Sequence, residues 1–358
     1  MWYNTGKAGE RAQAAGIMTK NEGIQMIEWK RPELQDLDRI RETAAKCSSF
    51  GSDMSAVNIF LLANKYDIHI AYFDDLLIRR YTTRERNLGR NGYTFPLGTG
   101  DPGEAIEALS READVCEEND PVCEGEEDCP HAKELHHMPH LCHEWLEKGL
   151  TKFCLLTEDQ KAFIEDRLPE FEISFYPGDS DYIYTAEHLA RLPGKKNHKK
   201  KNHVSRFKRE FPDHEFQLLT KENAADLFTI EKRWINERGA ALEHSHIVEQ
   251  CEIRTALGMT DELKLTGGII YANGEPAAMS IASEISPGVY DIHFEKSYGR
   301  FAELGAFAAI NQMMAEYLLE EKGAEWINRE EDIGSPGLKK AKESYHPDMM
   351  LHKYSATR

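Results

Sequence analysis

The fold is decided by the stretch Val289-Tyr-Asp-Ile-His-Phe-Glu-Lys-Ser-Tyr-Gly-Arg-Phe-Ala-Glu-Leu-Gly305, then an apolar segment, then Trp326-Ile-Asn-Arg-Glu-Glu-Asp-Ile-Gly-Ser-Pro-Gly-Leu-Lys-Lys-Ala-Lys-Glu-Ser-Tyr345. This pattern predicts a strand, a glycine turn, a helix, a second strand ending at Asn328 and a second helix from about Pro336. A glycine turn that feeds a helix leaves backbone N–H groups free at the helix N-terminus, where a phosphate binds well. We therefore expect a phosphate-bearing acyl carrier to bind at this turn.

The side chains around this turn supply candidate ligands for the carrier. Gly299 and Gly305 are the candidate turn residues, and Lys296 and Arg300 can neutralise phosphate charge beside them. Asn328, at the end of the next strand, is a further candidate for donor binding. Isolated glycines more often mark ordinary turns than ligand sites, so a plain crossover between helix and strand stays open as the alternative.

Three side chains after the turn are candidates for catalysis. Tyr345 shares a helix face with Ala341 at i, i+4 spacing and can protonate a leaving group. Glu295 and Glu330 lie near the ends of two neighbouring predicted strands, so either can serve as a general base. The structural alternatives are a buried tyrosine with an ordinary hydrogen bond and carboxylates that are only surface charge.

Length and patterning predict an α/β (α+β) protein with two domains. A chain of 358 residues is too long for one ordinary core. We expect a loose leader over 1–25, a first domain over 26–190 with an insertion at 114–144, a basic connecting segment over 191–212 and a second domain over 213–358. Each domain is expected to hold a mixed, mostly antiparallel sheet flanked by helices.

In the first domain the apolar runs predict strands over Ile59–Leu62, Ile68–Phe73 and Leu76–Ile78. In the second domain, strands over Leu263–Tyr271 and Ala277–Ile285 are expected to form a meander that leads into the glycine turn.

The overall charge limits the possible partners. The net charge of −18 makes the molecule as a whole repel nucleic acid and anionic membranes. No run approaches the ~18 to 20 apolar residues that span a bilayer, and the start of the chain lacks the apolar core of a signal peptide. Seven cysteines fit a reducing compartment better than a disulfide framework, so we expect a soluble, cytoplasmic protein.

One strongly basic segment interrupts this acidic chain. Between 195 and 209 there are eight lysines and arginines and no carboxylate, which leaves about −26 on the remainder (−18 minus 8). Lys199, Lys200 and Lys201 form its centre and are candidates for binding the phosphates of a carrier, possibly a tRNA. The alternative is a solvated linker helix whose charges serve solubility.

A cysteine- and histidine-rich acidic insertion is a candidate metal site. Thiolates and imidazoles suit zinc, and the candidate ligands are Cys116, Cys123, Cys129, His131 and Cys142. Their spacing matches no compact zinc ribbon, so a disordered acidic loop is the alternative.

The motifs together resemble the phosphatidylglycerol lysyltransferase C-terminal domain family. The resemblance rests on Lys195-Lys-Asn-His-Lys-Lys-Lys-Asn-His203, His293-Phe-Glu-Lys296, Asn328-Arg-Glu-Glu-Asp-Ile-Gly334 and Tyr345-His-Pro347, and it covers about Met26 to Tyr354 apart from the insertion. It implies two tandem GNAT-like domains and a donor that is aminoacyl-tRNA or acyl-CoA. Membrane-bound relatives present a lipid with a separate membrane part, which this sequence lacks.

The expected reaction is attack by an amine or hydroxyl on an activated acyl carbonyl without a covalent enzyme intermediate. Positioning and charge stabilisation would supply most of the rate. The acceptor is expected to be a small molecule or a peptide. The alternative function is a degenerate GNAT-like binding or regulatory protein that has lost catalysis.

Overall fold

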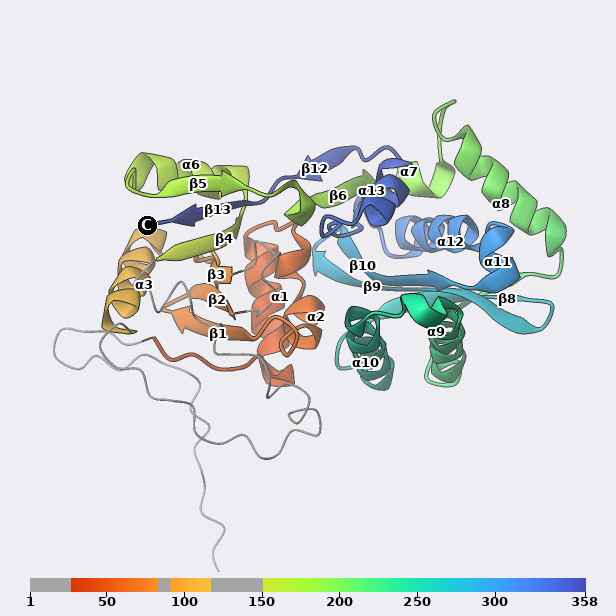
Figure 1. The fold of residues 1–358 in the computed structure, drawn as a ribbon, viewed down its shortest axis with the longest axis horizontal. Coiled ribbons are helices and arrows are strands. Elements are labelled where there is room, and N and C mark those ends of the chain that lie inside the picture. Colours follow the sequence, from red (N-terminus) through yellow and green to blue (C-terminus); the bar gives the residue numbers. More distant parts are fainter. Residues whose placement is uncertain (1–26, 83–90, 117–150) are drawn as a thin grey trace, which may run out of the picture.

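The computed structural model describes residues 27–82, 91–116 and 151–358, which form two lobes that each contain a sheet covered by helices (Figure 1). The predicted class, two mixed α/β domains in tandem, is confirmed. The expected leader and most of the insertion lie outside the described residues. So do Cys123, Cys129, His131 and Cys142, and of Cys116 only the backbone is described, so the zinc site stays a prediction.

The first sheet has the strand order β1-β2-β3-β4-β13-β5, and its first two strands form the predicted hairpin. The β3–β4 pair is parallel and its neighbours are antiparallel. Helices α1 and α2 pack on one face of the sheet, and α3 and α6 pack on the other. The bounds are β1 (Ile68–Phe73), β2 (Leu76–Thr82), β3 (Asn91–Tyr93), β4 (Lys152–Leu156), β5 (Glu172–Phe175), β13 (Tyr354–Thr357), α1 (Leu37–Lys46), α2 (Ala56–Leu61), α3 (Pro102–Cys116) and α6 (Glu158–Arg167).

The second sheet has the order β12-β6-β11-β10-β9-β8-β7, with β10 and β11 parallel and the other neighbours antiparallel. Helices α9 and α10 cover one face, and α7, α8 and α12 cover the other (Figure 1). The bounds are β6 (Asp181–Thr185), β7 (Glu215–Leu218), β8 (Thr266–Ala272), β9 (Glu275–Ser286), β10 (Val289–Ser297), β11 (Trp326–Asn328), β12 (Met349–Leu351), α7 (Ala186–Arg191), α8 (His198–Glu210), α9 (Ala224–Arg238), α10 (His244–Gly258), α11 (Gly299–Glu303), α12 (Ala306–Glu321) and α13 (Pro336–Glu343).

The two lobes exchange strands across the predicted domain boundary. β6 precedes residue 190 in the sequence but lies in the second sheet, and β13, at the end of the chain, lies between β4 and β5 in the first sheet. One apolar core also runs across both lobes, since residues of α1 and α2 share a cluster with residues of α9, α10 and β10. The two lobes are therefore interlocked, and each sheet includes a strand from the other part of the chain. Among the described residues, no helix combines the length and the apolar composition needed to cross a bilayer.

The strand predicted over Ile59–Leu62 is wrong, because these residues belong to α2 and its end. Ser55 caps this helix through its hydroxyl, which accepts from the backbone N–H of Asn58. Nearly every residue of α2 is buried, so the apolar run shows no helical periodicity. The periodicity of a short, fully buried apolar run does not distinguish a helix from a strand, and the strand was predicted for this reason.

The basic segment is a helix of the second lobe. Val204 and Phe207 of α8 are buried, and Phe211 just beyond it continues this apolar stripe, while most of the lysines face outward. α8 also approaches α12 closely, because a Cβ at Gly305 would lie 2.3 Å from the backbone oxygen of His203. With a φ of +105°, Gly305 holds a conformation that other residues rarely adopt.

We predict that Gly305→Ala destabilises the second lobe by more than about 2 kcal/mol, because strain and a backbone clash add together. Gly323→Ala is the matched control: Gly323 has a φ of +67° but nothing within 4 Å of the added Cβ, so it should cost only about 1 to 2 kcal/mol. Urea unfolding of both variants measures the difference. Equal losses would contradict a close contact between α8 and α12.

Candidate active site

The two central parallel strands of the second sheet separate at the candidate site. β10 pairs with β11 only over Val289–Asp291, opposite Trp326–Asn328, although β10 continues to Ser297. Beyond β11 the chain turns through Glu330, whose φ of +58° lies in the left-handed region. The second half of β10 therefore has no strand partner on the side of β11, and we call this point of strand separation the opening.

On the face toward α8 and α12, five side chains from five segments meet beside this opening. The carboxylate of Glu295 accepts from Asn311 Nδ2 at 3.0 Å and from Arg329 at 3.2 Å. The Arg329 guanidinium lies 4.8 Å from the ring centre of Tyr345, and the Lys200 ammonium lies 3.7 Å from the same centre. Three predicted residues, Glu295, Lys200 and Tyr345, are thus brought together.

This group carries unbalanced positive charge and open hydrogen-bonding positions. One carboxylate, Glu295, faces the two cations Arg329 and Lys200. Burial and the charge of Arg329 lower the pKa of Lys200 to about 8. Within the described chain, Arg329 Nη1 and Asn311 Oδ1 are buried and have no hydrogen-bond partner. A donor and an acceptor beside an excess of positive charge suit a carbonyl or oxyanion ligand.

Burial also raises the pKa of Tyr345, so its phenol stays protonated at neutral pH. Tyr345 lies two residues beyond the end of α13, not within the helix as the spacing predicted. Its ring packs against Tyr184 at a centre distance of 6.5 Å.

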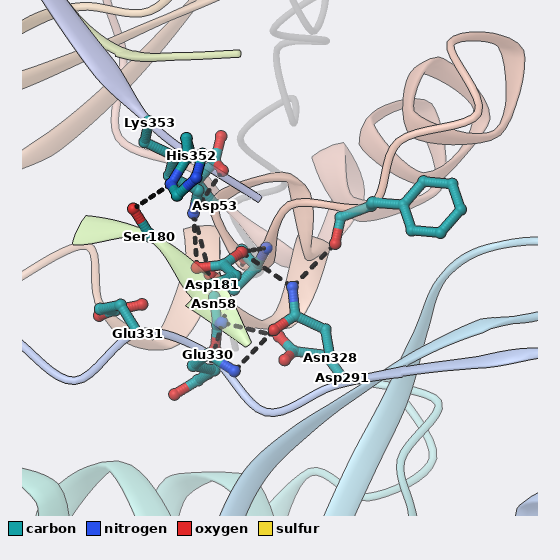
Figure 2. Close-up of polar contacts among 12 residues, drawn as sticks. Asp53, Asn58, Ser180, Asp181, Asp291, Asn328, Glu330, Glu331, His352 and Lys353 are labelled. Carbon is teal, nitrogen blue, oxygen red and sulfur yellow. Dashed lines mark hydrogen bonds and ion pairs between the residues drawn. The ribbon is translucent and has the colours of Figure 1, made fainter. Parts of the chain in front are cut away.

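On the opposite face, Asn58 of the first lobe contacts three side chains of the second, of which Figure 2 shows Asp291 and Glu330. Its Nδ2 donates at 2.9 Å to both Asp291 and Glu330, and its Oδ1 lies 2.9 Å from Nδ1 of His293. His293 Nε2 contacts the Ser283 hydroxyl at 2.7 Å. Asp291, His293 and Glu330 offer ligand atoms within 4.8 Å of one another, a set that suits a divalent metal. The Asn58 amide donates to one oxygen of each carboxylate, and within the described chain the other oxygen of Asp291, Oδ1, is buried without a hydrogen-bond partner.

Asn328 belongs to the contact between the lobes and does not reach Tyr345. Its amide donates at 2.8 Å to the Phe50 carbonyl and to Asp181, and its Oδ1 accepts from the Glu330 N–H (Figure 2). Because side chains alternate along a strand, Asn328 faces the first lobe while the next residue faces Tyr345. The structure thus separates the pair that we expected to flank the donor.

Lys296 lies on the same face as His293, beneath α9 and α10. Its ammonium is 2.5 Å from Glu249 and 3.8 Å from Glu231, and it lies 3.5 Å from the ring centre of Trp234. The predicted phosphate ligand is therefore already paired with carboxylates.

The glycine turn itself is only partly open. The N–H of Gly299 donates to Glu237 at 2.9 Å, so a carboxylate occupies the position expected for phosphate. Gly305 is buried against α8. Arg300 is exposed, as are Lys199 and Lys201 on α8.

One known protein family matches most of the chain. The family described as "Phosphatidylglycerol lysyltransferase, C-terminal" matches residues 44–357. The chain belongs to this family. The predicted family resemblance is thus confirmed, and the two mixed sheets flanked by helices agree with the predicted fold class. No curated protein matches the chain.

The solved structures that are similar to this chain include the following three. A conserved protein of unknown function from Bacteroides thetaiotaomicron is 29% identical, with a TM-score of 0.77 over 93% of this chain and 99% of that one. The C-terminal domain of a putative lysylphosphatidylglycerol synthetase from Agrobacterium fabrum is 12% identical, with a TM-score of 0.52 over 90% and 91%. FemX is 9% identical, with a TM-score of 0.52 over 92% and 96%. The last two similarities show the fold alone.

Sequence reasoning missed several residues of this family member's site. Arg329 was passed over although it follows a strand-end asparagine and must face the other way. Asn58 was not proposed as a site residue, and the residues that follow it, Ile59–Leu62, were predicted to form a strand. Glu231 and Glu252 were not singled out, although each is a charged residue next to buried isoleucines in a helix.

We predict that Glu231→Gln stabilises the protein at pH 8 by about 1 to 2 kcal/mol and changes little at pH 5. Burial raises the pKa of Glu231 to about 7, above its ordinary 4.5, so wild-type stability falls as pH rises between these values. Glutamine removes that loss because it carries no charge. Thermal melts at both pH values measure it, and a variant that is less stable at pH 8 would show that Glu231 stabilises the fold as a charged partner of Lys296.

Proposed function

We propose that this protein transfers an acyl or aminoacyl group from a phosphate-bearing carrier, aminoacyl-tRNA or acyl-CoA, to an amine or hydroxyl acceptor, which is a small molecule or a peptide. The observation that carries the proposal is the opening between β10 and β11, with Arg329, Lys200 and Tyr345 beside it. The family description, which names a lysyltransferase, supports the same class of reaction.

The two faces of the opening differ in charge, which suits a polyanionic donor on one side and an acceptor on the other. Exposed lysines of α8 surround the positive face, and Glu249 and Glu330 lie on the other. A carrier phosphate can rest on Lys199 and Lys201 while the acyl carbonyl reaches Arg329.

The proposed reaction begins when the acceptor attacks the acyl carbonyl and Glu330, whose side chain is 26% exposed, takes its proton. Charge that develops on the carbonyl oxygen is stabilised by Arg329 Nη1 and Lys200. Glu295 positions Arg329 through their ion pair. When the carbon–oxygen or carbon–sulfur bond to the carrier breaks, Tyr345 supplies a proton to the leaving atom.

One observation favours the second candidate, a binding or regulatory protein without catalysis. The backbone N–H of Gly299, expected to hold a phosphate, is bonded to Glu237. Mass spectrometry of ligands retained by the purified protein, with a gel shift against bulk tRNA, separates the two functions. A retained carrier with no transfer to any amine or hydroxyl would favour the binding protein.

We predict that Lys199→Glu with Lys201→Glu weakens carrier binding at least about 10-fold and reduces its salt dependence. Both lysines are exposed, so the melting temperature should not change. The same charge change at the exposed Lys46 and Lys232 is the control. Filter binding of tRNA and of CoA at several salt concentrations measures it. Equal losses in both double variants would mean that only net charge matters.

We predict that Tyr345→Phe lowers the transfer rate by about 10²- to 10⁴-fold, because the acid for the leaving group is lost. The phenylalanine ring keeps the volume that packs against Lys200, Arg329 and Tyr184. Transfer from a labelled donor is measured together with thermal melting. Full activity with a lowered melting temperature would assign Tyr345 to the scaffold.

A further inference from the structure

Two buried glutamates, one on α9 and one on α10, have carboxylate oxygens without a hydrogen-bond partner among the described residues. Glu231 is fully buried, and in the described part of the chain neither of its oxygens accepts a hydrogen bond. Glu252 is 7% exposed, and its Oε1 is likewise without a partner there. Buried carboxylates normally have donors, because removing them from water is costly. These two point to a cationic ligand.

The cluster already shows how an ammonium is bound. The Lys296 ammonium is held by Glu249 at 2.5 Å, lies 3.8 Å from Glu231 and sits over the Trp234 ring at 3.5 Å from its centre. A carboxylate and an aromatic face are the groups that recognise an alkylammonium.

Negative charge remains in excess after Lys296 is counted. Burial raises the pKa of Glu231 and of Glu252 to about 7, and the negative charge of Glu249 adds to both shifts. Lys296 and Arg238 oppose the shift of Glu231, and Lys65 opposes the shift of Glu252, without cancelling either one. A second cation would therefore be attracted and would hold both buried groups in their charged forms.

The cluster is open to solvent and lies on the side of β10 away from α8. The Glu249 side chain is 30% exposed, and Trp234 is half-buried. Lys296 follows Glu295 in the strand and faces the opposite way, so the cluster is across the sheet from Arg329 and the α8 lysines. A ligand here would reach the opening from the face opposite the proposed donor.

We propose that Glu231, Glu249 and Glu252, with the ring of Trp234, bind a primary alkylammonium group of the acceptor. This inference rests on the proposed function only in assigning the ligand to the acceptor, because ammonium binding can be measured without transfer. An ammonium of the donor's own acyl group has the same chemistry and is the competing source.

The first experiment titrates n-butylammonium into the full-length protein and follows the indole ¹⁵N–H signal of Trp234, assigned with Trp234→Phe. We expect a saturable shift, no shift with 1-butanol, and at least 10-fold weaker binding in Glu231→Gln with Glu252→Gln. The exposed Glu262→Gln is the control and should bind like the wild type. An equal response to butanol, or unchanged binding in the double variant, would overturn the site.

The second experiment uses Lys296→Met, which removes the competing internal ammonium and keeps an apolar chain beneath Trp234. Butylammonium should then bind at least fivefold more tightly, provided a thermal melt shows the variant folded. Weaker binding in a folded variant would mean that Lys296 builds the pocket and does not compete for it. If the variant fails to fold, the wild-type titration decides alone.

The third experiment separates the two sources. Saturating n-butylammonium, the probe of the first experiment, should suppress transfer to a labelled amine but leave carrier binding unchanged. If it instead displaces an aminoacyl carrier and not an acetyl carrier, the ammonium belongs to the donor and our assignment to the acceptor is wrong. Ammonium binding without any transfer would refute the proposed function while leaving the site intact.

Discussion

The buried carboxylate of Asp181 is the constraint on which the arrangement of the two lobes depends. It is completely buried and accepts from the Ser52 backbone and hydroxyl, the Asn328 amide and the Lys353 ammonium, at 2.8 to 3.0 Å (Figure 2). Ser52 belongs to the first lobe, Asn328 ends β11, and Lys353 lies where the chain returns to the first sheet. A buried charge that lost one of these donors would be strongly destabilising, so the four segments are held in one relative position.

The same contact sets the direction of the side chains at the candidate site. Because the Asn328 amide is directed toward Asp181 and Phe50, the alternation of the backbone sends Arg329 to the other face, where it meets Glu295. The turn at Glu330 then returns a carboxylate toward Asn58. A positive group and a negative group thus come to lie on opposite sides of one opening although their residues are neighbours in sequence.

Local signals in the sequence were enough for most of the second lobe. The alternation over residues 263–294 and the glycines after it predicted β8, β9 and β10 in order, and the charge of α8 was noted from composition alone. The exchange of strands between the lobes could not be predicted from the sequence. β6 and β13 are short, and their positions depend on pairing with strands that are far away in the chain. α2 was misread because burial on all sides removes the periodicity on which pattern reading relies.

The site was predicted less well than the fold, for a related reason. Glu295 and Tyr345 were found because each stands at the end of a predictable element. The roles of Lys296 and Gly299 were assigned from their nearness in sequence to a turn, whereas their contacts come from α9 and α10, some 50 residues earlier. Glu237 and Glu249 thus determine what the turn can bind, and the sequence of the turn itself does not predict these contacts.

The distribution of charge also shapes how a donor can approach. A molecule with a net charge of −18 repels a polyanion at long range, and salt screens this repulsion over about 8 Å under physiological conditions. Attraction of a polyanion to the lysines of α8 would therefore be a short-range effect. Rising salt weakens the overall repulsion and the local attraction together, so the salt dependence of binding should be shallower than eight positive charges alone would give. The same negative net charge attracts cations at long range, so it would favour the approach of a cationic acceptor to the face that carries Glu249 and Glu330.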